Sequence, residues 1–252
     1  MTPAPNPPAL TTERYLELLR ADMSRLREVG DADLTAPVPP CPGWTLADVL
    51  HHTAVVYLHK VEVMRGSGRP DPWPPEDVDS REPRAFLAQA GEELLHELSA
   101  RDPDEPSWTW AESNQTVGFW HRRMAQETAV HRVDAELAVG EVTPIDADLA
   151  VDGVDEVLVL MLAGDWSSDD TPAPINARVR VATGGRAWTA TCSASSVEVA
   201  EDDEDAVAAT VSGEPHDVLL WLWGRTGDDA VRLDGDPTVI AGLRQRLVEA
   251  TQ

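Results

Sequence analysis

The chain alternates between long segments with apolar residues at helical spacing and short segments rich in proline, glycine and acid. Residues 12–29 form the first long segment, and their apolar stripe consists of Tyr15, Leu18, Leu19, Met23 and Leu26. Recurrence at three- and four-residue intervals predicts an amphipathic helix. The same spacing predicts helices over residues 46–65, 83–100 and 118–139, with Thr45 capping the second and Gly140 ending the fourth.

The pattern changes after residue 144, where short β-prone runs appear at residues 177–181, 187–191 and 207–211. Helical segments at 149–162, 215–223 and 237–250 lie around them. Four helices followed by a mixed half predict an α+β protein, with a four-helix bundle at residues 9–143 and a small α+β domain at 144–252. The Pro-rich residues 1–9 are expected to be disordered.

Composition narrows the function classes. The 252 residues carry a formal net charge of −25, which disfavours nucleic acid and anionic membranes as partners because both repel an acidic protein. No apolar run approaches the roughly 20 residues of a membrane span, and no secretory signal is visible. Two cysteines, Cys41 and Cys192, make no disulfide framework. A cytoplasmic protein with reduced thiols is expected, and its oligomeric state is left open.

The fourth predicted helix carries polar groups on its apolar side. Glu127 and His131 are one helical turn apart, and Arg123 and Asp134 lie near the centre of the same face. Such groups are costly to bury unless something satisfies them. One solution is an internal network that pairs Arg123 with Glu127 and Asp134 with His131, and the other is a metal ion.

The second helix supplies further imidazoles. Its apolar stripe leaves His51 nearly opposite the core, whereas His52 lies on the flank, about 100° away. We therefore expect His52 to reach into the bundle, with His59 as a competing candidate two turns on. Two imidazoles and a carboxylate suit Zn²⁺ or a similar divalent ion and leave an open position for water or a thiolate.

Two short motifs and a C-terminal segment make the sequence resemble a known family. Residues 41–52, CPGWTLADVLHH, resemble the opening of the second helix in the mycothiol-dependent maleylpyruvate isomerase family, in which a histidine follows the tryptophan by eight positions. Residues 122–134 resemble its second signature. Residues 217–225 and 233–236 resemble its C-terminal domain, so the similarity spans most of the chain.

The resemblance implies a DinB-like four-helix bundle joined to a small α+β domain related to sterol-carrier folds. It implies a zinc-like divalent metal held by His52, Glu127 and His131, with mycothiol as the thiol cosubstrate. Asp134 is expected to orient His131. Arg225 matches a family arginine near the active site and is expected either to bind an anionic substrate group or to cap its own helix.

The family reaction is thiol addition to the cis double bond of maleylpyruvate, rotation, and elimination to fumarylpyruvate. General thiol S-transfer to a small electrophile is a close second expectation, because one scaffold serves several chemistries. Two other classes stay open. One is a metal hydrolase that uses a zinc-bound water, and the other is a non-catalytic ligand-binding module.

Overall fold

A computed structural model describes residues 10–66, 68–166, 175–203 and 205–251. The expected disorder of residues 1–9 lies outside these ranges. The chain divides into two compact units, Met1–Pro144 and Ile145–Gln252. The first is helical and the second combines helices with a sheet, so the predicted α+β class is confirmed.

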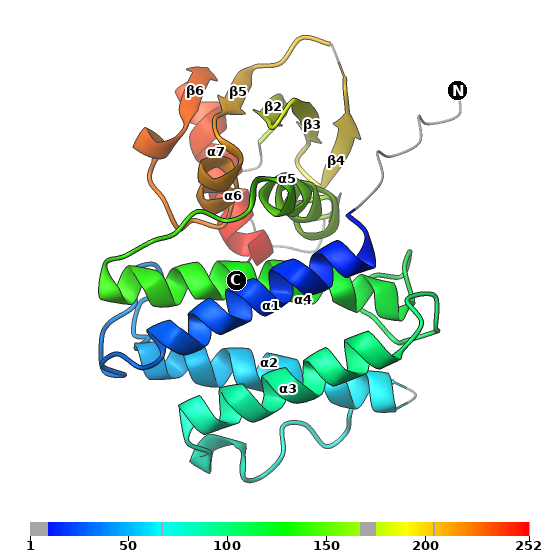
Figure 1. Ribbon diagram of the computed structural model, residues 1–252. Helices are drawn as coiled ribbons and strands as arrows, with labels where there is room; N and C mark the ends of the chain where they lie inside the picture. The colour runs from blue at the N-terminus through cyan, green and yellow to red at the C-terminus, as the bar shows by residue number, and fades with distance from the viewer. Residues whose placement is uncertain (1–9, 67, 167–174, 204, 252) are drawn as a thin grey trace. The chain divides into compact units, whose positions relative to one another are not determined.

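The first unit is a bundle of four long helices (Figure 1). They are α1 (Thr12–Val29), α2 (Leu46–Arg65), α3 (Pro83–Ala100) and α4 (Val117–Val139), and a short 3₁₀ turn, η1 (Val78–Ser80), precedes α3. Helix α1 packs along α4, α2 packs along α3, and α2 also contacts α4. The α2–α4 contact brings the two histidine-bearing segments together.

The helix ends follow from local chemistry. The backbone N–H of Thr45 donates to the Asp48 carboxylate at 2.7 Å, which satisfies a donor at the start of α2. Gly140 adopts a left-handed conformation with φ 81° and ends α4. Glycine has no Cβ and adopts that conformation at little cost in free energy, which explains why α4 ends there. Both termini match the sequence predictions.

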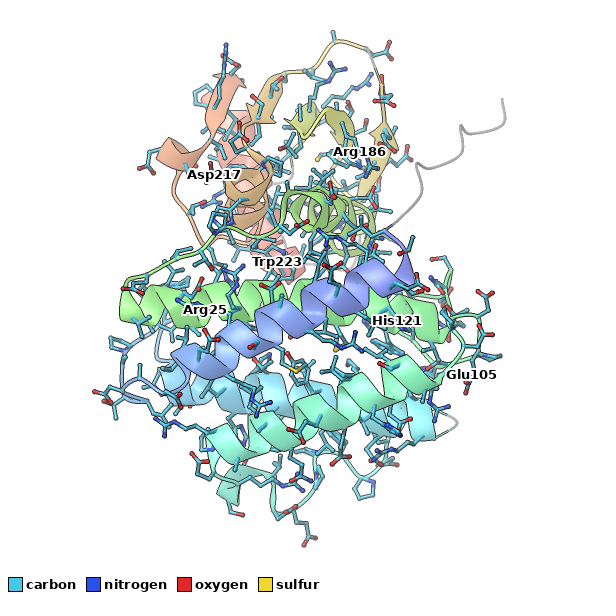
Figure 2. The ribbon with its side chains drawn as sticks, in the orientation of Figure 1. Arg25, Glu105, His121, Arg186, Asp217 and Trp223 are labelled. Carbon is cyan, nitrogen blue, oxygen red and sulfur yellow. The ribbon has the colours of Figure 1, made fainter. Side chains whose placement is uncertain are left out.

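Helix α4 is the most enclosed element of the bundle, and its buried residues include charged side chains. Arg132 donates to Glu136 at 2.7 Å and to Asp22 of α1 at 3.0 Å. Arg25, labelled in Figure 2, donates to the other oxygen of Glu136 at 2.7 Å. Since each buried charge has an opposite partner, this network joins α1 to α4 without a metal.

The second unit contains a six-stranded sheet in the part of the chain that the structure describes, with order β1-β4-β3-β2-β5-β6. The strands are β1 (Gly164–Asp165), β2 (Ala177–Thr183), β3 (Arg186–Cys192), β4 (Ser196–Glu201), β5 (Ala209–Ser212) and β6 (Arg232–Gly235). Strands β2 and β5 pair in parallel, and the other neighbours are antiparallel. The predicted strands correspond to β2, β3 and β5.

The helices of this unit are α5 (Ala147–Glu156), α6 (Pro215–Leu222) and α7 (Pro237–Thr251), with a π-helical turn η2 (Val157–Leu162) and a 3₁₀ turn η3 (Asp228–Ala230). Helix α7 packs against β2, β5 and η2, and α5 packs against α6. Alternate residues of β2, including Val179 and Val181, are buried beneath this helical cover.

Candidate metal centre

Three candidate ligands converge where α2 meets α4. His52 comes from α2, and Glu127 and His131 come from α4. Oε1 of Glu127 lies 3.6 Å from His52 Nε2 and 3.2 Å from His131 Nε2. One ligand atom from each residue lies within 4.8 Å of the others. These side chains were the ligand set expected from the sequence, and the fold brings them together.

The other histidines of α2 are directed elsewhere. Nε2 of His51 lies 3.0 Å from the Val78 carbonyl oxygen, and its ring lies against Phe86. The His59 ring packs edge-on against Trp73, with ring centroids 4.8 Å apart. Within the described residues, the cluster of potential ligands therefore contains His52 and neither His51 nor His59.

A turn at residues 41–44 forms one wall of the centre. The Trp44 N–H donates to the Cys41 carbonyl at 2.9 Å, and Gly43 has φ 86°. This turn places the Trp44 ring 5.1 Å from the His52 ring and stacks it on His131 at 6.5 Å. The sequence motif CPGWT thus has a local physical role, since it lays an aromatic face against both imidazoles.

Charges around Glu127 favour its ionised form. Burial would raise the pKa of the Glu127 carboxyl, but the positive charges of His131 and Arg123 hold that pKa well below its ordinary value. Burial lowers the pKa of His131, but the charge of Glu127 outweighs it and raises that pKa to about 9. The Glu127 carboxylate is therefore anionic at neutral pH, as a carboxylate ligand must be, whereas His131 has to lose a proton before its Nε2 can bind an ion.

Both internal pairs considered from the sequence are present. Arg123 donates to Oε2 of Glu127, and His131 Nδ1 lies 2.9 Å from Oδ2 of Asp134. The two arrangements are compatible, because Arg123 contacts one oxygen of Glu127 while the other faces both imidazoles. Asp134 leaves Nε2 of His131 directed to the centre, which is the orientation a metal ligand needs.

The donor set fits a divalent ion. Ligands about 2.1 Å from a common zinc lie roughly 3.4 Å apart in tetrahedral geometry, close to the 3.2 and 3.6 Å found around Glu127. The His52 side chain is 40% exposed, whereas those of Glu127 and His131 are 15% and 11% exposed. His52 is thus the most exposed of the three candidate ligands.

Lys60, on α2, is a charged residue that the sequence analysis did not single out. Its ammonium lies 4.9 Å from the centre of the buried Trp120 ring. Burial lowers the pKa of the Lys60 ammonium to about 8, and the charge of Glu127 opposes that shift while the charge of Arg123 adds to it. A compositional signal was available, because Lys60 is the only lysine in the chain.

Two tryptophans of the first unit differ in exposure. Trp120 is fully buried and donates to Ser107 at 3.1 Å, so it fills the bundle core. Trp110 is 41% exposed, with its ring edge-on to Phe119. A separate groove of about 450 Å³ lies between α1 and α3, lined in part by Met23 and Leu87, and contains none of the three candidate ligands.

Arg225 lies in the second unit, just beyond the end of α6. It donates to the Trp223 carbonyl at 2.7 Å, and its guanidinium lies 5.8 Å from the centre of the Trp223 ring. Trp223, labelled in Figure 2, is the residue at which α6 ends. This contact is the helix-capping arrangement that the sequence left open as an alternative to substrate binding.

Comparison with known proteins agrees with this architecture. Two family models match the chain, the mycothiol maleylpyruvate isomerase N-terminal domain at residues 16–136 and the C-terminal domain of the same family at residues 148–242. No curated protein sequence matches significantly.

None of the helices in the described residues is long and apolar enough to cross a membrane.

Two solved structures share the fold. Both are crystal structures of the mycothiol-dependent maleylpyruvate isomerase, one of them a histidine-to-alanine mutant. Each has a TM-score of 0.63 and 17% sequence identity, with 89% of this chain and 93% of the other chain covered. The similarity extends through both units rather than the helical bundle alone.

Proposed function

Because the chain belongs to the mycothiol-dependent maleylpyruvate isomerase family, we propose that it is a metal-dependent enzyme that activates mycothiol for attack on a small electrophile. The observation that carries the proposal is the convergence of His52, Glu127 and His131 on one point. The reaction we favour is cis–trans isomerisation of a maleylpyruvate-like enedione. Transfer of the thiol onto another electrophile uses the same first step.

The isomerisation needs no net proton transfer. The thiolate forms a C–S bond to one alkene carbon, and the π electrons move onto the conjugated carbonyl oxygen. Rotation follows about the new single bond. The electrons then return, the C–S bond breaks and the trans alkene forms. The chemical requirement is a thiolate held beside the double bond, which a divalent ion supplies when bound by lowering the pKa of the thiol.

The protein's residues have separate tasks in this proposal. His52, Glu127 and His131 hold the ion, and Asp134 keeps the His131 ring oriented through its 2.9 Å contact with Nδ1. Trp44 lies against both imidazoles and limits how far their rings can turn.

Arg225 is proposed to bind an anionic group of the substrate, on the strength of its match to the family arginine. A guanidinium suits a carboxylate by a two-pronged contact. Arg225→Met separates this role from helix capping. Substrate binding predicts a raised KM with unchanged thermal stability, whereas capping alone predicts a lower melting temperature with unchanged KM.

The first experiment measures metal in protein purified without a chelator or a metal-binding tag. About one equivalent of zinc or another divalent ion per chain is expected. Maleylpyruvate is then supplied with and without mycothiol, and turnover is expected only with both metal and thiol. Turnover that persists without thiol would favour a hydrolase that uses a metal-bound water.

A non-catalytic binding module is the second candidate, and a specific observation favours it. Arg123 and Asp134 already satisfy Glu127 and His131 without a metal. Purified protein that lacks metal and takes up none on addition of zinc would support this alternative. The matched control for both experiments is His51→Ala, since His51 contacts Val78 and lies outside the cluster.

A further inference from the structure

The two most deeply buried arginines of the described residues have different surroundings. Arg132 is 1% exposed and Arg246 is 0% exposed. Arg132 donates to Glu136 at 2.7 Å and to Asp22 at 3.0 Å, so two carboxylates balance its charge. No carboxylate of the described residues pairs with Arg246, whose contacts are an aromatic ring and a backbone carbonyl.

Arg246 occupies a core position of α7. The buried residues of this helix share one face at helical spacing, and they are Ile240, Leu243, Arg246 and Leu247. A charged side chain on such a face costs free energy unless its surroundings satisfy it. Helix α7 therefore carries a cation at a position where an aliphatic side chain would pack.

The contacts of Arg246 leave most of its donors unused. Its guanidinium carbon lies 4.8 Å from the centre of the Trp166 ring, and Nη2 donates to the Ser193 carbonyl at 3.5 Å, which is a long hydrogen bond. Trp166 is held in place because its indole N–H donates to the Leu162 carbonyl at 3.0 Å. Nε and Nη1 of Arg246 are buried and have no hydrogen-bond partner among the described residues.

The thiol of Cys192 does not balance this charge. Cys192 lies on β3, next to Ser193 in the chain, and is 2% exposed. Burial raises the pKa of the thiol to about 11, and the charge of Arg246 opposes only part of that shift. Cys192 is therefore uncharged at neutral pH, and the charge of Arg246 needs another partner.

An anion meets both requirements of the Arg246 side chain. A water molecule would accept hydrogen bonds from Nε and Nη1 but would leave the positive charge uncompensated in the protein interior. An anion accepts the same hydrogen bonds and balances the charge. The site is enclosed, with Trp166 over the guanidinium. Enclosure favours a small, singly charged ion, because less hydration free energy is lost on burial than for a multiply charged one.

We propose that Arg246 forms a buried binding site for a small monovalent anion, of which chloride is the simplest example, and that the bound anion stabilises the second unit. Nε and Nη1 donate to the anion, and the Trp166 ring covers the guanidinium. All residues of this site belong to the second unit, whereas the candidate metal ligands belong to the first. The inference is therefore independent of the proposed function.

Anion-dependent unfolding is the first test. The full chain is desalted into sodium gluconate, whose anion is too large for an enclosed site, and sodium chloride is added at constant ionic strength. A ligand that binds only the folded state stabilises it, so we expect a saturable rise in melting temperature of about 5 °C. Hydrogen exchange should show added protection in peptides from α7 and β3. No rise, or a rise without that protection, would overturn the proposal.

A pair of variants assigns the response to Arg246. Arg246→Met removes the charge and keeps a long side chain. We expect it to lose the chloride response and, in gluconate, to melt at or above the temperature of the parent, because a buried uncompensated charge is removed. Arg232→Met is the matched control, since Arg232 lies on β6 of the same unit with its side chain 77% exposed. A chloride response that persists in Arg246→Met, or disappears equally from the control, would contradict the assignment.

Crystallography with bromide tests the site without a variant. Crystals of the parent protein soaked in sodium bromide should show an anomalous-scattering peak in contact with Nε or Nη1 of Arg246. Bromide found at the exposed surface alone would be an adventitious ion only, and the proposal would fail. An ordered water at these two donors, with no bromide, would show that hydration satisfies them and would overturn the proposal as well.

Discussion

Nδ1 of His131 lies 2.9 Å from Oδ2 of Asp134, whose side chain has no exposed surface. A buried carboxylate in this position fixes the tautomer and orientation of the imidazole. Asp134→Asn removes the negative charge and keeps the shape. We expect zinc affinity to fall about 10- to 100-fold while the helical circular dichroism signal is retained. Zinc competition with a chromophoric chelator measures the change, and unchanged affinity would exclude an orienting role.

His131→Ala should abolish metal binding and leave a folded bundle. It removes one of the three clustered ligands, and a carboxylate with one imidazole holds a divalent ion weakly. Metal content by mass spectrometry and helicity by circular dichroism check the two halves of the prediction. Retention of one equivalent of metal in this variant would show that the ion lies elsewhere.

Arg132→Met should destabilise the first unit. It leaves Glu136, which is fully buried, with Arg25 as its remaining cation, and it leaves Asp22 without the 3.0 Å contact. Breaking a buried ion pair typically costs about 3–5 kcal/mol. Urea denaturation measures the loss of unfolding free energy. A loss within the ordinary range of exposed pairs, below about 1 kcal/mol, would show that Arg25 alone suffices.

Lys60→Met should raise stability at neutral pH. The folded pKa of Lys60 is about 8 against an ordinary 10.5, so the folded state binds its proton less tightly than the unfolded chain. The penalty is fully present below about pH 8 and is relieved as pH rises to about 10.5. Each pKa unit corresponds to about 1.4 kcal/mol, so a gain on the order of 1–3 kcal/mol is expected.

The pH dependence is the control for that prediction. The unfolding free energy of the parent should contain a component that increases between pH 8 and 10.5, and Lys60→Met should lose it. An identical slope in both proteins would mean that Lys60 titrates normally in the folded state.

Cys192 should resist thiol reagents in the native protein. Its side chain is buried in β3, and burial raises the pKa of the thiol to about 11 with Arg246 opposing that effect. Cys41, in the turn beside Trp44, is only half-buried. One thiol should react with Ellman's reagent at pH 8, and two should react in denaturant. Native Cys41→Ser protein should give almost no reaction.

Much of the bundle followed from the sequence alone. The apolar spacing of α1 to α4 and the cap residues Thr45 and Gly140 are local properties, so the helix limits were predictable within a few residues. Helical periodicity also put Glu127 and His131 on one face of α4 and turned His51 from the core. The binding of metal by these side chains stays a prediction.

Strand pairing and the contacts between distant side chains depended on the tertiary structure and could not be predicted from local sequence patterns. The strands β1, β4 and β6 were not predicted from the sequence, and they form by pairing: β4 with β3, β6 with β5, and β1 with β4. The packing of α2 on α4 brought His52 to Glu127 and Lys60 to Trp120, and the loop after α2 brought Trp73 to His59. Sequence periodicity fixes the face of a helix on which a side chain lies. Which groups meet that face depends on packing between segments distant in the chain.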